Sequence, residues 1–185
     1  GMTCAEVAQY LLRAAGIYDV RIEPAQGLLA DHYDPGNKVL RLSPEVYSRP
    51  TLAAIGVAAH ETGHAVQHAT GYAPLALRSA LVPMAATSNL WIFLFIIGLF
   101  MGSPLLQNLG ILLFSGTILF MLVTLPVEFN ASSRAIRMLS ETGLLAADEL
   151  PAVKEVLSAA AMTYVAAALM AILQLVRLLL LRRED

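Results

Sequence analysis

The fold is decided by two neighbouring apolar runs, LVPMAATSNLWIFLFIIGLFMG at Leu81–Gly102 and LLQNLGILLFSGTILFMLVTLPV at Leu105–Val127. Neither run contains a charged residue, and each reaches the length of about 20 residues with which a helix crosses a bilayer core. The pair Ser103-Pro104 between them favours a tight turn, so the sequence predicts a transmembrane helical hairpin. Gly98 and Gly102 form a GxxxG pair, which we interpret as ordinary glycine use in a membrane helix rather than a dimerisation motif.

The composition of the whole chain supports a membrane protein. Hydrophobic residues make up 57% and charged residues 14%, against about 25% charged residues in soluble domains. The net charge of −2 provides no basic field for nucleic acid. A third apolar run, Val156–Leu181, carries Gln174 and Arg177. We expect it to span the bilayer, with packing of its first half against the N-terminal part of the chain as the alternative.

The segment before these runs predicts a mainly α fold with a small β-hairpin. Residues 3–16 form an amphipathic helix pattern, with Thr3 and Glu6 spaced as in a capping box. The apolar residues next in the sequence are Val20 and Ile22 and, after a turn, Leu28 and Leu29. Turn-forming residues at 31–38 and a strand at Val39–Leu42 follow them. This hairpin offers an edge on which an extended segment could pair. Further predicted helices are a short turn opening at Ser43-Pro44-Glu45 and a longer helix over Thr51–Thr70. The lone cysteine, Cys4, is interpreted as an incidental residue in a frayed terminus.

The chemistry is carried by His60-Glu61-Thr62-Gly63-His64, an HExxH motif. On a helix, residues four apart lie on one face, so both imidazoles can bind one Zn²⁺. Glu61, next to the first histidine, is placed to act as the general base of peptide hydrolysis. The alternative is an ordinary pair of surface histidines. The apolar run Ala53–Ala59 disfavours surface histidines, because it indicates a buried helix. Burying ionisable groups is costly unless a partner such as a metal ion compensates for the lost hydration.

A catalytic zinc site needs a third protein ligand, and two residues are candidates. His68 shares the helix face but lies eight residues beyond His60, which advances a helix by about 12 Å, too far for one metal. We therefore interpret His68 as a supporting or surface residue. Glu128 is the better candidate, because it is the first charged residue after the second apolar run, and Pro126 could kink the helix that carries it. A solvated helix cap is the alternative for Glu128.

Three residues are candidates for stabilising the oxyanion that forms during hydrolysis. Arg134 lies one and a half turns past Glu128, and otherwise serves as a basic flank of the membrane span. Tyr164 lies in an alanine-rich helix where its hydroxyl needs a partner, and is otherwise a packed core tyrosine. His32 is otherwise a plain turn residue. The sequence leaves these alternatives open.

The sequence resembles the YugP-type membrane zinc metallopeptidases. The residues that carry the resemblance are Asp31–Pro35 (DHYDP), Val57–Ala65 (VAAHETGHA), Leu77–Pro83 (LRSALVP), Thr124–Ser132 (TLPVEFNAS) and Ala159–Ala168 (AAAMTYVAAA). The resemblance implies a neutral zinc peptidase of the prokaryotic plasma membrane with one Zn²⁺ per chain. Members usually begin with a further membrane helix, so we expect the native N-terminus to lie upstream.

A more distant similarity connects the chain to the HtpX-type proteases of the gluzincin group. Their third ligand lies in a pattern like Glu-Phe-x-Ala-Asp, which Glu128–Ser132 matches with serine in the last place. In such sites the aspartate orients a ligand histidine. The similarity implies that Glu128 is a ligand and that Ser132, or another group, replaces the aspartate.

We expect a single membrane metallopeptidase domain over residues 1–185. Its parts are an N-terminal catalytic part (1–80), the transmembrane hairpin (81–127), a third-ligand helix and loop (128–155) and the C-terminal apolar helix (156–181). Arg78, Arg134 and Arg137 flank the hairpin and place the active site on the cytoplasmic side by the positive-inside rule, although Arg182-Arg183 oppose it.

The predicted function is that of a zinc endopeptidase acting at the membrane surface on proteins or peptides near the bilayer. A non-catalytic zinc-binding adaptor or protease regulator is the alternative. A metal-handling membrane protein is disfavoured, because the two clear spans hold too few polar residues to form an ion path. The substrate and the oligomeric state are not indicated.

Overall fold

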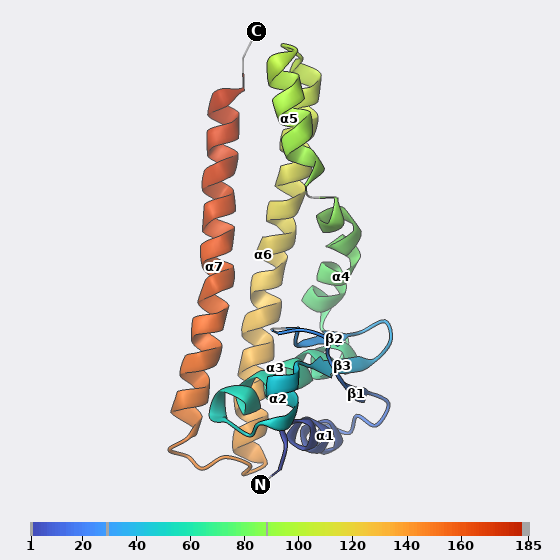
Figure 1. Cartoon of the computed structure of the whole chain (residues 1–185), viewed down its shortest axis with the longest axis vertical. Coiled ribbons are helices and arrows are strands. Elements are labelled where there is room, and N and C mark those ends of the chain that lie inside the picture. The colour runs from blue at the N-terminus through green and yellow to red at the C-terminus, as the bar shows by residue number, and fades with distance from the viewer. Residues whose placement is uncertain (1, 29, 88, 183–185) are drawn as a thin grey trace. The chain divides into compact units, whose positions relative to one another are not determined.

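The computed structural model describes residues 2–28, 30–87 and 89–182 of the chain (Figure 1). Leu29 and Arg183, which contribute to the hairpin and orientation predictions, lie outside the described residues. The described part is mostly helical with one small sheet, as predicted. The elements, in order, are α1 (Cys4–Ala14), β1 (Arg21–Pro24), β2 (His32–Asp34), β3 (Val39–Leu42), α2 (Pro44–Ser48), α3 (Leu52–Ala69), α4 (Ala73–Ala86), α5 (Leu90–Phe100), α6 (Pro104–Glu141) and α7 (Leu150–Leu181).

These elements form two compact units. The first contains the residues up to Ala73 together with Val127–Ala161, and the second contains Pro74–Pro126 and the residues from Met162 onward. Helices α6 and α7 therefore each contribute to both units. The division near Pro126 lies at the predicted end of the second apolar run, while the prediction of one domain over the whole chain stays a prediction.

Helix α1 begins with the predicted capping box. The Thr3 backbone N–H donates to Glu6 Oε2 at 2.7 Å, and the Glu6 N–H donates to Thr3 Oγ1 at 3.3 Å. This satisfies two of the backbone groups that a helix start leaves unpaired. The apolar face of α1 is fully buried at Leu11 and Leu12, so the cap fixes a helix that belongs to the core of the first unit.

Cys4 corrects the interpretation of a frayed terminus. Its side chain is 0% exposed, belongs to the cluster that includes Leu40 and Ala58, and its thiol donates to the Arg49 carbonyl at 3.2 Å. Burial raises its pKa to about 11. The capping box holds the chain end in place, and this is what brings Cys4 into the core.

We expect Cys4 in the folded protein to react with iodoacetamide at pH 8 about 10²-fold more slowly than a free cysteine, because the thiolate is the reactive form. Since Cys4 is the only cysteine in the sequence, the incorporated label measured by mass spectrometry reports this position alone. Labelling in denaturant is the control. Equal rates in the folded and denatured protein would show that α1 does not pack as described.

The sheet differs in detail from the predicted hairpin. Its strand order is β1-β3-β2, with β1 parallel and β2 antiparallel to β3. The predicted turn at 31–38 is wrong in its first half, because residues 32–34 form β2 and only the following residues turn. There the Asp34 carboxylate accepts from the Asn37 N–H at 3.1 Å, and Lys38 adopts a positive φ of 51°. Val39–Leu42 is the central strand, so only β1 and β2 provide sheet edges.

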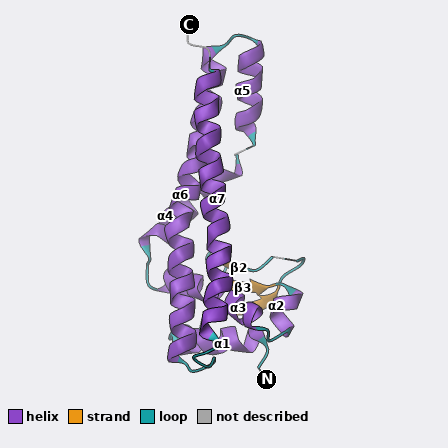
Figure 2. Ribbon diagram, turned by 90° about the vertical axis from the view of Figure 1, so that its left-hand side faces the viewer, coloured by secondary structure: helices purple, strands orange, loops and turns teal. Residues whose placement is uncertain are grey.

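Helices α2 and α3 begin as the sequence predicts. Pro44 occupies the first turn of α2, where the absent N–H costs nothing. Thr51 caps α3 by accepting from the Ala54 N–H at 3.2 Å. Figure 2 shows β2 and β3 of the sheet beside α3, and the cluster that includes Leu40, Leu42 and Ala58 fills the space between helix and sheet. The sheet and α1 thus support the helix that carries the HExxH motif.

The first apolar run, predicted as one span, is divided between two helices. Helices α4 and α5 are bent by 45° with respect to each other. The Thr87 hydroxyl donates to the Met84 carbonyl at 2.8 Å, a local bond of the kind that competes with continued helix. The predicted turn at Ser103-Pro104 is confirmed, since α6 begins at Pro104.

The hairpin of α5 and α6 is closely packed at its turn. A Cβ added to Gly98 would lie 2.7 Å from the Gln107 backbone nitrogen, so any other residue would push the two helices apart. Gly98 therefore allows α5 and α6 to pack closely within this hairpin. Further along, Trp91 packs on Phe114 with ring centroids 4.5 Å apart.

Helices α6 and α7 are each long and apolar enough to cross a membrane, and the bent pair α4–α5 makes a third candidate if it counts as one span. Helix α6 continues through Pro126 to Glu141, so the predicted hairpin and third-ligand segment share one helix. Within the second unit, the C-terminal end of α7 lies near the start of α6, where Arg182 donates to Asn108 Oδ1 at 3.3 Å.

Candidate metal centre

Helix α3 places the two histidines of the motif side by side. His60 and His64 lie one turn apart, and their rings meet edge to face with centroids 4.7 Å apart. Their Nε2 atoms are 3.1 Å apart. The histidine spacing in the sequence therefore gives the geometry that the HExxH motif predicts.

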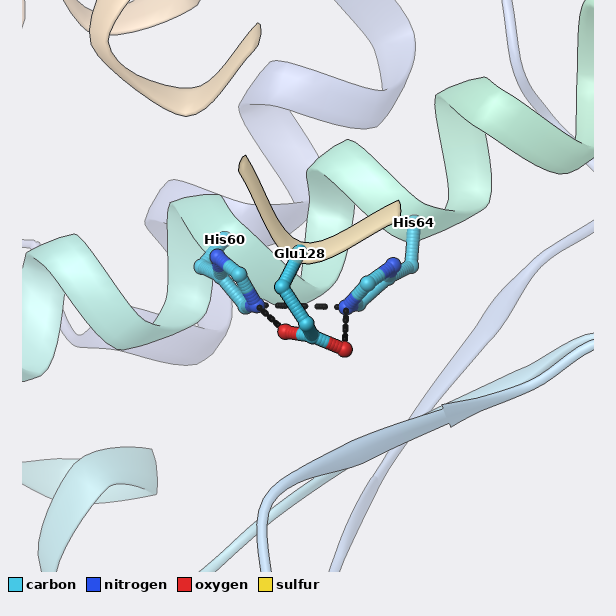
Figure 3. Close-up of side chains that lie close together, drawn as sticks. All are labelled: His60, His64 and Glu128. Atoms are coloured by element: carbon cyan, nitrogen blue, oxygen red, sulfur yellow. Dashed lines mark hydrogen bonds and ion pairs between the residues drawn. The ribbon is translucent and has the colours of Figure 1, made fainter. Parts of the chain in front are cut away.

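Helix α6 brings Glu128 to the same point (Figure 3). Its Oε2 lies 3.0 Å from His60 Nε2 and its Oε1 lies 3.6 Å from His64 Nε2. The three side chains are largely buried, with exposed fractions of 14%, 8% and 5% for His60, His64 and Glu128. Candidate ligands separated by 68 residues in sequence thus meet across two helices.

Gly63, inside the motif, permits this approach of the two helices. A Cβ at this position would lie 2.6 Å from the backbone carbonyl oxygen of Ala131, which is closer than real Cβ contacts come. Ala131 is fully buried on α6, one turn after Glu128. Because backbone atoms of a packed helix cannot move away cheaply, only glycine allows α6 to lie this close to α3.

The donor set fits a zinc ion. Tetrahedral zinc with bonds of about 2.0–2.2 Å separates its ligand atoms by about 3.3–3.6 Å. The separations of 3.0, 3.1 and 3.6 Å among the two Nε2 atoms and the carboxylate oxygens lie within a few tenths of an ångström of that range. Two imidazoles and a carboxylate are also the chemistry of catalytic zinc sites that keep one position open.

The second nitrogen of each histidine has its own partner. His60 Nδ1 lies 3.0 Å from Ser132 Oγ, and His64 Nδ1 lies 2.9 Å from Gln67 Oε1. Such contacts hold a ring with its other nitrogen toward the metal. Ser132, one of the groups expected to orient a ligand histidine, thus contacts His60, and its equivalence to the aspartate of the Glu-Phe-x-Ala-Asp pattern stays a prediction.

The electrostatic environment favours a cation. Burial lowers the pKa of His64, but the hydrogen bond to Glu128 and the negative charges of Glu61 and Glu128 outweigh burial and raise it. Glu61 itself is only 8% exposed. Two carboxylates in a largely buried site create the negative potential that a divalent ion neutralises.

The structure separates His68 from this group. Its Nδ1 lies 2.8 Å from the Tyr33 hydroxyl, on a cavity of about 310 Å³ that β2 also lines. The three residues that the structure groups as a possible metal site are His60, His64 and Glu128. This agrees with the expectation that His68 is a supporting or surface residue.

The three oxyanion candidates have different surroundings. Arg134 lies on α6, where its Nε donates to Asn130 Oδ1 at 2.8 Å and its guanidinium lies 5.7 Å from the centre of the Tyr72 ring. His32 is exposed, with Nδ1 2.8 Å from the Ala30 carbonyl oxygen. Tyr164, 41% exposed, belongs to the second compact unit. Their catalytic roles stay predictions.

Sequence reasoning missed Gln67 and Asn130 as parts of the site. Gln67 is fully buried and contacts both helices, donating to the Val127 carbonyl at 2.8 Å and to Asn130 Oδ1 at 2.9 Å. A signal was present, since Gln67 follows His64 by three residues and must share its helix face. The partner on α6 had no such signal.

Comparison with known proteins identifies the class to which this fold and site belong. Residues 1–183 match the family described as "Putative neutral zinc metallopeptidase", and the chain belongs to that family. It is 47% identical over 182 residues to the protein named "Putative membrane protease YugP" of Bacillus subtilis (strain 168), covering 98% of this chain and 81% of that protein. No solved structure matches. The resemblance to the YugP-type membrane zinc metallopeptidases is thereby confirmed.

Proposed function

We propose that the protein is a zinc-dependent endopeptidase of the gluzincin type that hydrolyses peptide bonds at a membrane surface. One observation carries the proposal: the Nε2 atoms of His60 and His64 and the carboxylate of Glu128 converge at zinc-ligand separations. Three protein ligands leave the fourth position of a tetrahedral ion for water or substrate. The family relationship supports a peptidase over other zinc enzymes.

In the proposed reaction, the zinc ion and Glu61 have separate roles. Bound zinc would lower the pKa of water and polarise the scissile carbonyl. The carboxylate of Glu61 accepts a proton from the attacking water and then donates it to the nitrogen of the leaving amine. Glu61 is suited to this role because it neighbours His60 and is only 8% exposed. No covalent bond between enzyme and substrate forms in this sequence.

Substrate binding involves the sheet and a donor for the oxyanion. Strand β2 lies at a sheet edge, beside α3, and an extended peptide can pair with such an edge. Arg134, His32 and Tyr164 are the proposed candidates for donating to the oxyanion. A donor there must lie about 2.7–3.1 Å from the developing charge.

The proposed location is the cytoplasmic face of a prokaryotic plasma membrane, with a multi-pass chain. Helix α6 leads directly from its apolar run to Glu128, so the proposed third ligand immediately follows Val127, the last residue of that run. Arg134 and Arg137 come next and support a cytoplasmic flank. The contact of Arg182 with Asn108 puts a basic residue near the opposite end of the candidate span, which the positive-inside rule disfavours.

Metal removal tests the proposal directly. We expect dialysis of the detergent-purified protein against a chelator to abolish cleavage of a quenched fluorescent peptide library. One equivalent of Zn²⁺ should restore it, because the proposed ligands belong to this chain alone. Magnesium, which prefers oxygen ligands, is the control and should not restore activity. Cleavage that survives complete zinc removal would contradict the proposal.

A further inference from the structure

We infer that Gln67 is a positioning residue for the metal centre and that it acts through a hydrogen-bonded chain running from Arg134 through Asn130 to His64. The inference rests on the metal site proposed above and concerns how that site holds one of its ligands. The four side chains lie on α3 and α6, and each link is 2.8 or 2.9 Å long.

The direction of each bond follows from the donor chemistry, beginning at Arg134. A guanidinium has only donors, so the atom of Asn130 that contacts Arg134 Nε must be its oxygen. Gln67 Nε2 donates to that same oxygen and to the backbone carbonyl of Val127. Both partner atoms are hydrogen-bond acceptors, so the NH₂ group of the Gln67 amide must face them and its oxygen must point the other way.

The fixed amide presents its oxygen to the metal ligand. Gln67 Oε1 lies 2.9 Å from His64 Nδ1. An amide oxygen only accepts, so His64 must carry its proton on Nδ1. In the neutral ring, which is the form that binds a metal, the lone pair therefore lies on Nε2, the atom that meets His60 and Glu128. The chain selects the tautomer of His64 that can bind a metal.

Burial makes this selection strict. Gln67 and Val127 are 0% exposed, so water cannot replace a lost link without opening the packing of α3 on α6. An unpaired buried amide costs about 1–3 kcal/mol. His60 differs, because its Nδ1 contacts a Ser132 hydroxyl, which can either donate or accept and so imposes no tautomer.

The chain also connects the two helices that supply the ligands. Val127, Asn130 and Arg134 follow one another at intervals of three and four residues, which places them on one face of α6. Gln67 holds that face to α3 immediately beside Glu128. Loss of Gln67 should therefore disturb both the orientation of His64 and the approach of the third ligand.

The test is the zinc affinity of the full chain, measured by competition with a chromophoric chelator. Gln67→Met keeps the side-chain volume and removes every polar atom of the link. We expect it to weaken zinc binding about 10- to 100-fold, the range typical for partners of metal ligands. Thr124→Val is the matched control, because Thr124 is also buried, lies on α6 outside the HExxH motif, and donates to the Phe120 carbonyl of its own helix. It should change the affinity less than threefold.

Two variants of Asn130 keep the inference testable if Gln67→Met does not fold. Asn130→Asp retains the acceptor oxygen used by Arg134 and Gln67 and should bind zinc within about threefold of the unsubstituted chain, whereas Asn130→Leu should lose about tenfold. In Gln67→Met, the further change Asn130→Leu should add little, because both act through one chain.

The outcomes separate this inference from the proposed function. Equal affinities for Gln67→Met and Thr124→Val, or equal losses for Asn130→Asp and Asn130→Leu, would overturn the positioning role while leaving the zinc site intact. Fully additive losses would also overturn it. An unsubstituted chain that binds no zinc would instead reject the metal site itself, and the inference with it.

Discussion

Replacement of Glu61 by glutamine is expected to lower kcat/KM for peptide hydrolysis about 10³-fold while zinc binding persists. Glutamine keeps the shape of the side chain but cannot accept the proton of the attacking water. General acid–base groups contribute about 10²–10⁴-fold to rates, and 10³-fold corresponds to about 4 kcal/mol of lost transition-state stabilisation. Glu61 is absent from the three-residue ligand group, so the metal should stay.

The matched control is Glu45→Gln, the same change at an exposed glutamate on α2, which should retain full activity. Zinc content measured on the same samples separates loss of chemistry from loss of metal. Hydrolysis that is unaffected by Glu61→Gln would contradict the proposed mechanism. Full zinc content without any hydrolysis in the unsubstituted protein would favour the alternative of a non-catalytic zinc-binding adaptor.

Replacement of Gly63 by alanine should damage the metal centre without touching a ligand. The new Cβ would lie 2.6 Å from the Ala131 carbonyl oxygen, so α6 must move away from α3 and take Glu128 with it. Overpacking of this kind costs about 1–3 kcal/mol. If the cost falls on the metal-bound arrangement, zinc affinity drops about 5- to 150-fold. Competition with a chelator measures this drop.

The control for Gly63→Ala is Gly116→Ala on α6. Both changes introduce a better helix former, but the Cβ at Gly116 meets the sulfur of Met84, a flexible side chain that can turn aside. Gly116→Ala should leave zinc affinity unchanged. Unchanged affinity in Gly63→Ala would mean that the close approach of α3 and α6 is not required for the site.

The sequence predicts local structure well where one interaction decides it. The capping box of Thr3 and Glu6 and the position of Pro44 at the start of α2 are both determined within one helical turn. His60 and His64 follow the same logic, because a helix alone brings residues four apart together. Glu128 could be predicted as a ligand candidate for another reason: it is the first charged residue after a long apolar run.

The remaining features depend on contacts between distant segments. The parallel pairing of β1 with β3 has no signature within either strand. The bend between α4 and α5 falls in a run that reads as uniformly apolar. Gln67 and Asn130 meet only because Gly63 lets two helices approach. Neither hydropathy nor motif spacing in the sequence indicates which distant residues come into contact.

The central claim is that His60, His64 and Glu128 together hold one zinc ion. Elemental analysis of the purified full chain and of Glu128→Ala tests it most directly. We expect about one zinc per unsubstituted chain, as a three-ligand site binds a single ion. Glu128→Ala should lose most of it after dialysis, because two histidines alone bind zinc weakly. A Glu128→Ala protein that retains a full equivalent of zinc would contradict the claim.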